Sequence, residues 1–127
     1  MAIELETHKL IANMAPQDYI SVILPTRQRI EPCIKSVMTM VETAQHPGKV
    51  EFVLVWDDDD RQTAEATMEK LSPKLKDAGV NRFSAHTIPR RGYERLNEYV
   101  TWGAKQSVGQ WIIFWNDDAV MNTFNWD

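Results

Sequence analysis

Acidic and basic side chains gather in four short clusters of this sequence, and their residue types suit a metal ion and a phosphorylated ligand. Carboxylate oxygens are the ligands that hard cations such as Mg²⁺ or Mn²⁺ prefer, and the planar fork of donors on arginine suits phosphate oxygens. In chain order the clusters are Pro25-Thr26-Arg27, Asp57 to Asp60, Arg90-Arg91 and Asn116-Asp117-Asp118. Brought together, they would form a site for a divalent cation and a phosphorylated compound.

Each cluster directly follows a stretch that the sequence predicts to be a β-strand. β-branched and apolar residues fill 19–24 and 50–56, a weaker run covers 82–88, and five large apolar residues occupy 111–115. A continuous apolar run such as 111–115, set between Gly109 and the last acidic cluster, is typical of a strand buried on both faces. We therefore expect that strand to be buried on both of its faces.

Apolar residues at helical spacing separate the predicted strands. The spacing predicts helices over 30–41, 64–75 and 96–107, with Pro32 in the first turn of the first helix. Pro73 should break or restart the second helix after Ser72, and Gly103 should allow the third to approach the sheet closely. The order β-α-β-α-β-α-β predicts an α/β fold with a mostly parallel sheet flanked by helices. The four clusters then share the carboxyl edge of the sheet, where such folds bind ligands.

Composition describes an ordinary globular domain and excludes several classes of function. The chain has 127 residues, of which 43% are hydrophobic and 25% charged, and a net charge of -4 that gives no support to general nucleic-acid binding. A single cysteine, Cys33, excludes an internal disulfide framework, and no apolar run reaches the length of a membrane span. We expect a cytoplasmic protein with an N-terminal arm over 1–18 and one domain over 19–127.

Structural explanations compete with the functional one at each cluster. Asp59 and Asp60 are expected to form a solvated turn in which one of them caps the next helix. For Asp57, a structural role and a functional role are expected equally. At least one of Arg90 and Arg91 is expected to be an ordinary surface charge. Cys33 is expected to be a small buried hydrophobic residue of the first helix. The sequence has no glycine-rich phosphate loop.

The chain resembles the N-terminal, nucleotide-sugar-binding half of the GT-A fold glycosyltransferases, especially the inverting family 2. The resemblance runs from about Tyr19 to Asp118 and implies a Rossmann-like nucleotide-binding domain. It rests on four stretches that match the family's opening strand and Pro-Thr turn, its second strand and aspartate, the end of the helix before its metal strand, and its Asp-x-Asp strand. These are residues 20–29, 51–58, 103–109 and 111–118.

The resemblance implies roles for individual residues. In the family, the positions of Pro25, Thr26 and Arg27 line the nucleoside pocket. Asp57, or Asp58 in a register shifted by one, would accept a hydrogen bond from the base or the ribose. Arg90 or Arg91 would lie near the nucleotide, as a basic residue of the family can.

The same resemblance implies a divalent cation, Mn²⁺ or Mg²⁺, that bridges the diphosphate and is held by Asp118. Asn116 replaces the first aspartate of the Asp-x-Asp motif, so Asn116 and Asp117 are expected to contact the nucleotide instead. The cation would neutralise charge developing on the leaving diphosphate.

The resemblance implies a donor domain of a glycosyltransferase, with a nucleotide-diphosphate sugar, expected to be a UDP-sugar, as its partner. No residue matches the family's catalytic base, and the acceptor-binding half that follows in the family is expected to be absent. Two alternatives remain open. One is a non-catalytic sugar-nucleotide-binding or assembly module, which an exposed sheet edge would favour as a homo-oligomer. The other is a nucleotidyltransferase, although the turn after the first strand lacks the glycines usual in that class.

Overall fold

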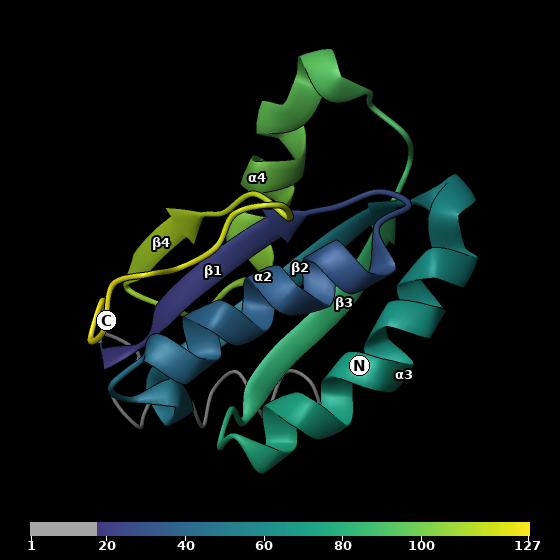
Figure 1. The fold of residues 1–127 in the computed structure, drawn as a ribbon. Coiled ribbons are helices and arrows are strands. Elements are labelled where there is room, and N and C mark those ends of the chain that lie inside the picture. Colours follow the sequence, from purple (N-terminus) through teal and green to yellow (C-terminus); the bar gives the residue numbers. More distant parts are fainter. Residues whose placement is uncertain (1–17) are drawn as a thin grey trace, which may run out of the picture.

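The computed structural model describes residues 18–127, which fold into a four-stranded parallel sheet with helices on both faces (Figure 1). The expected N-terminal arm over 1–18 lies outside the described residues except for Asp18. The strand order is β3-β2-β1-β4, and every neighbouring pair is parallel. The strands are β1 (Ile20–Pro25), β2 (Val50–Asp57), β3 (Arg82–Ile88) and β4 (Trp111–Phe114). The prediction of a parallel α/β fold is confirmed.

The strand buried on both faces is β2 and not β4. All eight residues of β2 are buried, because β1 and β3 flank it and helices cover both of its faces. β4 has only four residues and forms the edge of the sheet, with Trp111 64% and Phe114 42% exposed. The prediction that this strand is buried on both faces is therefore wrong. Trp111, Ile112 and Phe114 are exposed and Ile113 is half-buried, because β4 has a strand neighbour on one side only in the described chain.

The helices divide between the two faces of the sheet. α2 (Ile30–Thr43) and α3 (Arg61–Asp77) lie on one face and enclose the larger core together with Val22 and Leu24 of β1. α4 (Leu96–Gln106) lies on the other face. There Tyr99 packs with Ile23, the residue of β1 between Val22 and Leu24. Figure 1 shows α2 and α3 on one side of the strands and α4 on the other. The alternation follows from the period of two along a strand.

Two expectations about the helices have different outcomes. α3 runs without a break through Pro73, so the predicted interruption after Ser72 is wrong. Leu71 and Leu75 flank Pro73 and are fully buried. Their burial stabilises the helix even though Pro73 has no backbone N–H to donate within it. Gly103 does allow close approach, because a Cβ there would lie 2.5 Å from the Cγ2 atom of Ile23.

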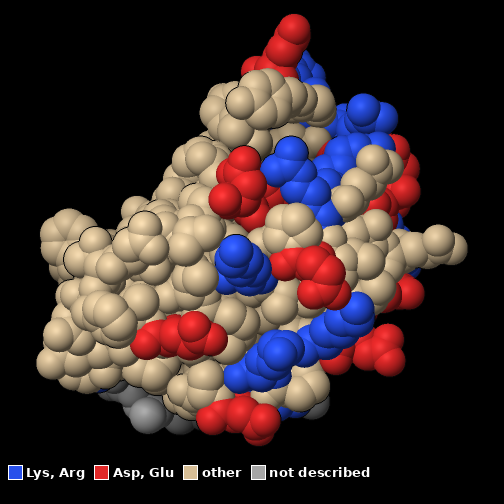
Figure 2. All heavy atoms as spheres, viewed as in Figure 1, with Lys and Arg blue, Asp and Glu red and all other residues tan. Residues whose placement is uncertain are grey.

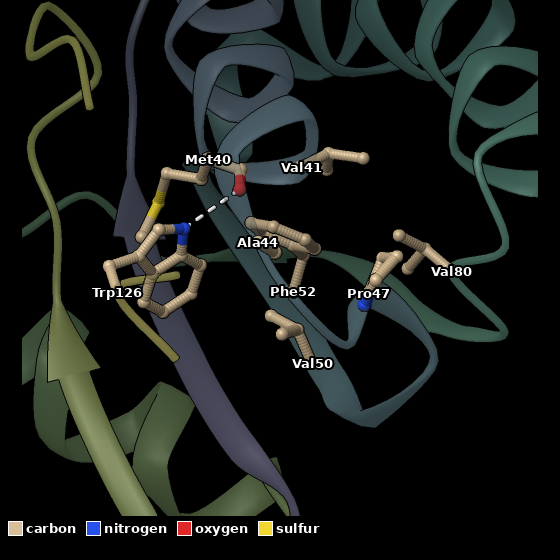
Figure 3. Close-up of a pocket in the computed structure, with 8 residues that line it drawn as sticks. All are labelled: Met40, Val41, Ala44, Pro47, Val50, Phe52, Val80 and Trp126. Atoms are coloured by element: carbon tan, nitrogen blue, oxygen red, sulfur yellow. Dashed lines mark hydrogen bonds between the residues drawn. The ribbon is translucent and has the colours of Figure 1, made fainter. Parts of the chain in front are cut away.

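The residues after β4 return across α2 and hold the last acidic cluster in place. The indole of Trp126 donates a hydrogen bond to the carbonyl of Met40 (2.9 Å) and closes one side of a small apolar gap (Figure 3). The carboxylate of Asp127 accepts hydrogen bonds from the backbone N–H groups of Gln45 (2.6 Å) and His46 (2.7 Å). These contacts anchor the chain beyond Asn116, whose carbonyl accepts a bond from a serine of α2 (3.0 Å).

A buried polar network joins the strands at the opposite, amino-terminal edge of the sheet. Glu51 of β2 is 2% exposed and accepts hydrogen bonds from the hydroxyl of Ser21 (2.7 Å) and the backbone of Val108 (2.8 Å). Its other oxygen pairs with Arg82 of β3 (3.1 Å).

Among residues 18–127, no helix is long and apolar enough to cross a membrane.

Candidate functional site

A cleft of about 530 Å³ lies at the carboxyl edge of the sheet, where the four polar clusters were expected to meet. Figure 2 shows acidic and basic side chains interspersed around the end of the molecule where β1 and β2 finish in Figure 1. Seven of the ten sequence-predicted site residues line the cleft: Pro25, Thr26, Arg27, Asp57, Arg90, Asn116 and Asp117. The other three, Asp58, Arg91 and Asp118, do not line it. The parallel sheet brings the four clusters to one place because it aligns the ends of its strands.

Arg27 links the first cluster to the second. Its guanidinium donates to Asp57 at the end of β2 (2.7 Å) and makes two bonds to Asp59 (2.6 and 3.1 Å). The hydrogen bonds that Arg27 donates hold the pKa of Asp59 below its usual range. The same bonds, accepted by Asp59 and Asp57, raise the pKa of Arg27. Arg27 is therefore a fixed positive charge that faces the cleft.

The turn after β1 turns two arginines towards the cleft without using glycine. Gln28 has a left-handed backbone with φ of 54°, which a residue other than glycine adopts at some cost. Asp60 offsets this cost, since its buried carboxylate accepts the N–H of Gln28 (2.7 Å). Asp60 occupies the position before α3, yet neither it nor Asp59 makes a side-chain cap. The predicted capping role is wrong because both carboxylates bind the turn after β1 instead, Asp59 through Arg27 and Asp60 through Gln28.

The last acidic cluster meets β1 through Asp117. One oxygen of Asp117 accepts from the hydroxyl of Thr26 (2.7 Å), and the other from the guanidinium of Arg29 (3.1 Å). Asp118 lies 3.7 Å from the same guanidinium, but its side chain is 68% exposed and does not line the cleft. Arg29 is a site residue that the sequence analysis did not assign. Its position two residues after Arg27, in a turn that follows a strand, was the available signal.

The two arginines after β3 differ in their surroundings. Arg90 lines the cleft and lies 3.6 Å from Asp59, whereas Arg91 pairs with Glu98 of α4 (3.6 Å). Both side chains are exposed, Arg90 by 59% and Arg91 by 43%, and of the two it is Arg90 that lines the cleft.

Tyr99 of α4 is the second residue that sequence reasoning missed. It is 6% exposed, lines the cleft, and donates its hydroxyl hydrogen to Asp57. Burial and this bond raise the pKa of Tyr99 above its ordinary value. The helical spacing from Leu96 could have placed Tyr99 towards the sheet, but nothing in the sequence pairs it with Asp57.

Carboxylates near the cleft fit a cation that is shared with a ligand better than one enclosed by protein. No group of three or more histidine, cysteine, aspartate or glutamate side chains is arranged to hold a metal ion within residues 18–127. Asp117 is engaged by Thr26 and Arg29, and Asp118 is open to solvent. Mg²⁺ is commonly bound by one or two carboxylates together with substrate phosphates and water. Asp117 and Asp118 are the carboxylates of this cluster that such an arrangement would use.

Cys33 is fully buried in α2, which confirms the expectation of a structural residue. Burial raises the pKa of its thiol to about 12. The thiol is therefore not a candidate nucleophile.

Comparison with known proteins reveals a likeness of fold. No family model and no curated protein matches the chain. Among solved structures, the chain is similar to a mannosyltransferase from Pyrobaculum calidifontis solved with GDP-mannose and Mn²⁺, with a TM-score of 0.67 and 14% sequence identity. The match covers 94% of this chain and 36% of the mannosyltransferase chain. The fold described here is thus similar to about a third of that mannosyltransferase chain.

Proposed function

We propose that this chain binds a nucleotide-diphosphate sugar and acts as the donor domain of a glycosyltransferase of the GT-A type, similar to family 2. One observation supports this most directly. At the carboxyl edge of a fold similar to a mannosyltransferase, a cleft of about 530 Å³ combines three arginines with two aspartates. That volume is within the usual range for small-molecule sites.

In this proposal, different residues of the cleft bind different parts of the nucleotide-diphosphate sugar. Asp57 accepts a hydrogen bond from the ribose or the base, using carboxylate lone pairs that its protein partners leave available. Arg27 and Arg29 bind the diphosphate, because arginine donors match phosphate oxygens in charge and geometry. Arg90 adds a third positive charge at the rim of the cleft.

A divalent cation belongs to this proposal as a group shared between protein and ligand. Asp118 would hold it, with Asp117 and the diphosphate as further sources of oxygen. When bound, such a cation neutralises charge on the leaving diphosphate. In the whole reaction the sugar would pass to a hydroxyl-bearing acceptor. No residue of the cleft is proposed as the catalytic base. The chain spans about a third of the length of the mannosyltransferase to which its fold is similar.

Calorimetric titration tests the binding. UDP, GDP and dTDP should each be titrated with and without Mn²⁺, and at least one should bind. Arg27→Gln should weaken the binding at least about tenfold, since it removes a charged hydrogen-bond donor. Lys76→Gln, an equal change of charge in the last turn of α3, should leave affinity unchanged. Absence of binding by all three nucleotides with metal would refute the proposal.

A second pair of variants tests the cation. Asp118→Ala should abolish the part of the affinity that depends on Mn²⁺ and preserve the part that does not. Asp77→Ala, which removes an exposed carboxylate at the end of α3, is the matched control. Equal losses in both variants would contradict the assignment of Asp118.

The edge strand favours one alternative, an assembly module. β4 leaves one side of its backbone without a strand partner in the described chain, and Trp111, Ile112 and Phe114 are all more than 40% exposed. Such edges pair readily with other chains. Size-exclusion chromatography with light scattering would support this alternative if the protein is dimeric and Ile112→Lys makes it monomeric. A monomer that binds nucleotide would leave the donor-domain proposal standing alone.

A further inference from the structure

Tyr99 lies where α4 passes over the carboxyl end of the sheet, and its hydroxyl is deeply placed. The residue is 6% exposed, and its ring packs with the apolar residues that α4 covers, Ile23, Val53 and Val55. A buried hydroxyl is costly unless it is hydrogen-bonded. The bonds of Tyr99 therefore explain why a phenol, and not a phenylalanine ring, fits this position.

Every hydrogen-bonding position of the hydroxyl is used. Its single hydrogen is donated to Asp57, and its oxygen accepts the backbone N–H groups of Arg91 (2.7 Å) and Gly92 (3.2 Å). A phenol offers one donor and two acceptor lone pairs. Tyr99 thus joins three parts of the cleft: the end of β2, the segment after β3, and α4.

The segment joined in this way also reaches the cleft through Arg90, whose guanidinium lies 3.6 Å from Asp59. Residues 89–95 connect β3 to α4, and Gly92 turns the chain there with φ of 86°. Arg90 and Tyr93 line the cleft from this segment, although the side chain of Arg90 is 59% exposed and Tyr93 is 88% exposed. Their positions depend on the backbone between them, and Tyr99 binds that backbone at two N–H groups.

We propose that Tyr99 is a positioning residue of the nucleotide site. By holding the Asp57 carboxylate and the backbone at Arg91 and Gly92 to one oxygen atom, it assembles two walls of the cleft before the ligand arrives. Preassembly lowers the ordering cost of binding. This inference rests on the proposed function, because it assigns a role in binding the nucleotide.

Tyr99→Phe removes the hydroxyl and keeps the ring, and Tyr19→Phe makes the same change before the start of β1, at the other end of the strand from the cleft. Three measurements compare each variant with the unmodified chain: nucleotide affinity by calorimetry, hydrogen exchange of the Arg91 and Gly92 amides by NMR, and thermal unfolding. We expect Tyr99→Phe to weaken nucleotide binding roughly tenfold and to speed exchange of both amides by a similar factor. Tyr19→Phe should change neither.

The outcomes separate the possibilities. Weakened affinity together with faster exchange at both amides supports the proposal. A lower unfolding temperature with unchanged affinity and unchanged exchange would mean that the hydroxyl serves stability alone, and the proposal would be overturned. If the unmodified chain binds none of the nucleotides, the proposed function fails first. Unchanged exchange in Tyr99→Phe would then also overturn the positioning of the segment, and faster exchange would support it.

Discussion

Glu51 provides a test of how the sheet is held together far from the cleft. Its carboxylate is 2% exposed, and three bonds of 2.7, 2.8 and 3.1 Å join it to β1, to Val108 in the loop between α4 and β4, and to β3. The perturbation is Glu51→Gln, which keeps the shape and one acceptor oxygen, compared with Glu51→Ala, which removes the group.

The two changes should differ in size. Glutamine can still accept from Ser21 and Val108, but it loses the charged bond to Arg82, and bonds to charged groups contribute about 1.5–3 kcal/mol. Alanine also takes away the acceptor that Ser21 and Val108 share, and breaking an ion pair with a buried carboxylate costs about 3–5 kcal/mol. For a domain of this size, the glutamine variant should unfold roughly 5–10 °C lower, and the alanine variant should lose about twice as much.

Urea unfolding followed by tryptophan fluorescence measures the free energy difference, and a calorimetric scan measures the temperature. Glu69→Gln, an exposed position of α3, should stay within about 0.5 kcal/mol of the unmodified chain. Nucleotide affinity of the folded Glu51→Gln protein should be unchanged, because the network lies at the opposite edge from the cleft. A Glu51→Gln protein as stable as the unmodified chain would refute the reasoning, since it would mean that the Arg82 pair contributes no stability.

Three further predictions concern single side chains. Burial raises the pKa of the Cys33 thiol to about 12, so the thiol should resist a thiol reagent at pH 8 in the native state and react on unfolding. The stability contributed by the buried neutral thiol is present below the pKa of the unfolded thiol and is lost as pH rises above that value. Asp59 should titrate by NMR with a pKa below the usual range of an aspartate, because Arg27 donates hydrogen bonds to it, and Arg27→Ala should raise that pKa. The stability from this pair is therefore lost as pH falls through the folded pKa. Gly103→Ala should destabilise the protein by about 1–2 kcal/mol in urea unfolding, because its Cβ would lie 2.5 Å from a buried methyl group. The same change at Gly48, where the nearest atom would be 3.5 Å away, should be tolerated.

Local pattern was enough to predict the elements of this fold. The third strand was expected over 82–88 and is Arg82–Ile88, and the first and second strands differ from expectation by one residue at their ends. Helices were found where apolar residues recur at helical spacing. Parallel order then determines that the strand ends share one edge, so the neighbourhood of Asp57 and Asn116 also followed from sequence.

Individual roles within the clusters could not be predicted in the same way. In the run of four aspartates, Asp57 binds Arg27 and Tyr99, Asp60 binds the backbone of Gln28, and Asp58 is exposed. Four identical side chains carry no local signal that distinguishes them. Each role depends on a partner about thirty or forty positions away in the chain, whose direction only the folded backbone determines.

The strand at 111–115 illustrates the limit. Its sequence determined that it is a strand and that polar residues follow it, because both are properties of consecutive residues. Its exposure was decided by the sheet order, which places it at the edge with β1 as its one described strand neighbour. The sequence likewise determined that Asp117 and Asp118 lie at the carboxyl edge. Only the tertiary structure decided that Asp117 faces Thr26 and Arg29 in the cleft while Asp118 faces solvent, because burial and pairing belong to neighbours in space and not to neighbours in the chain.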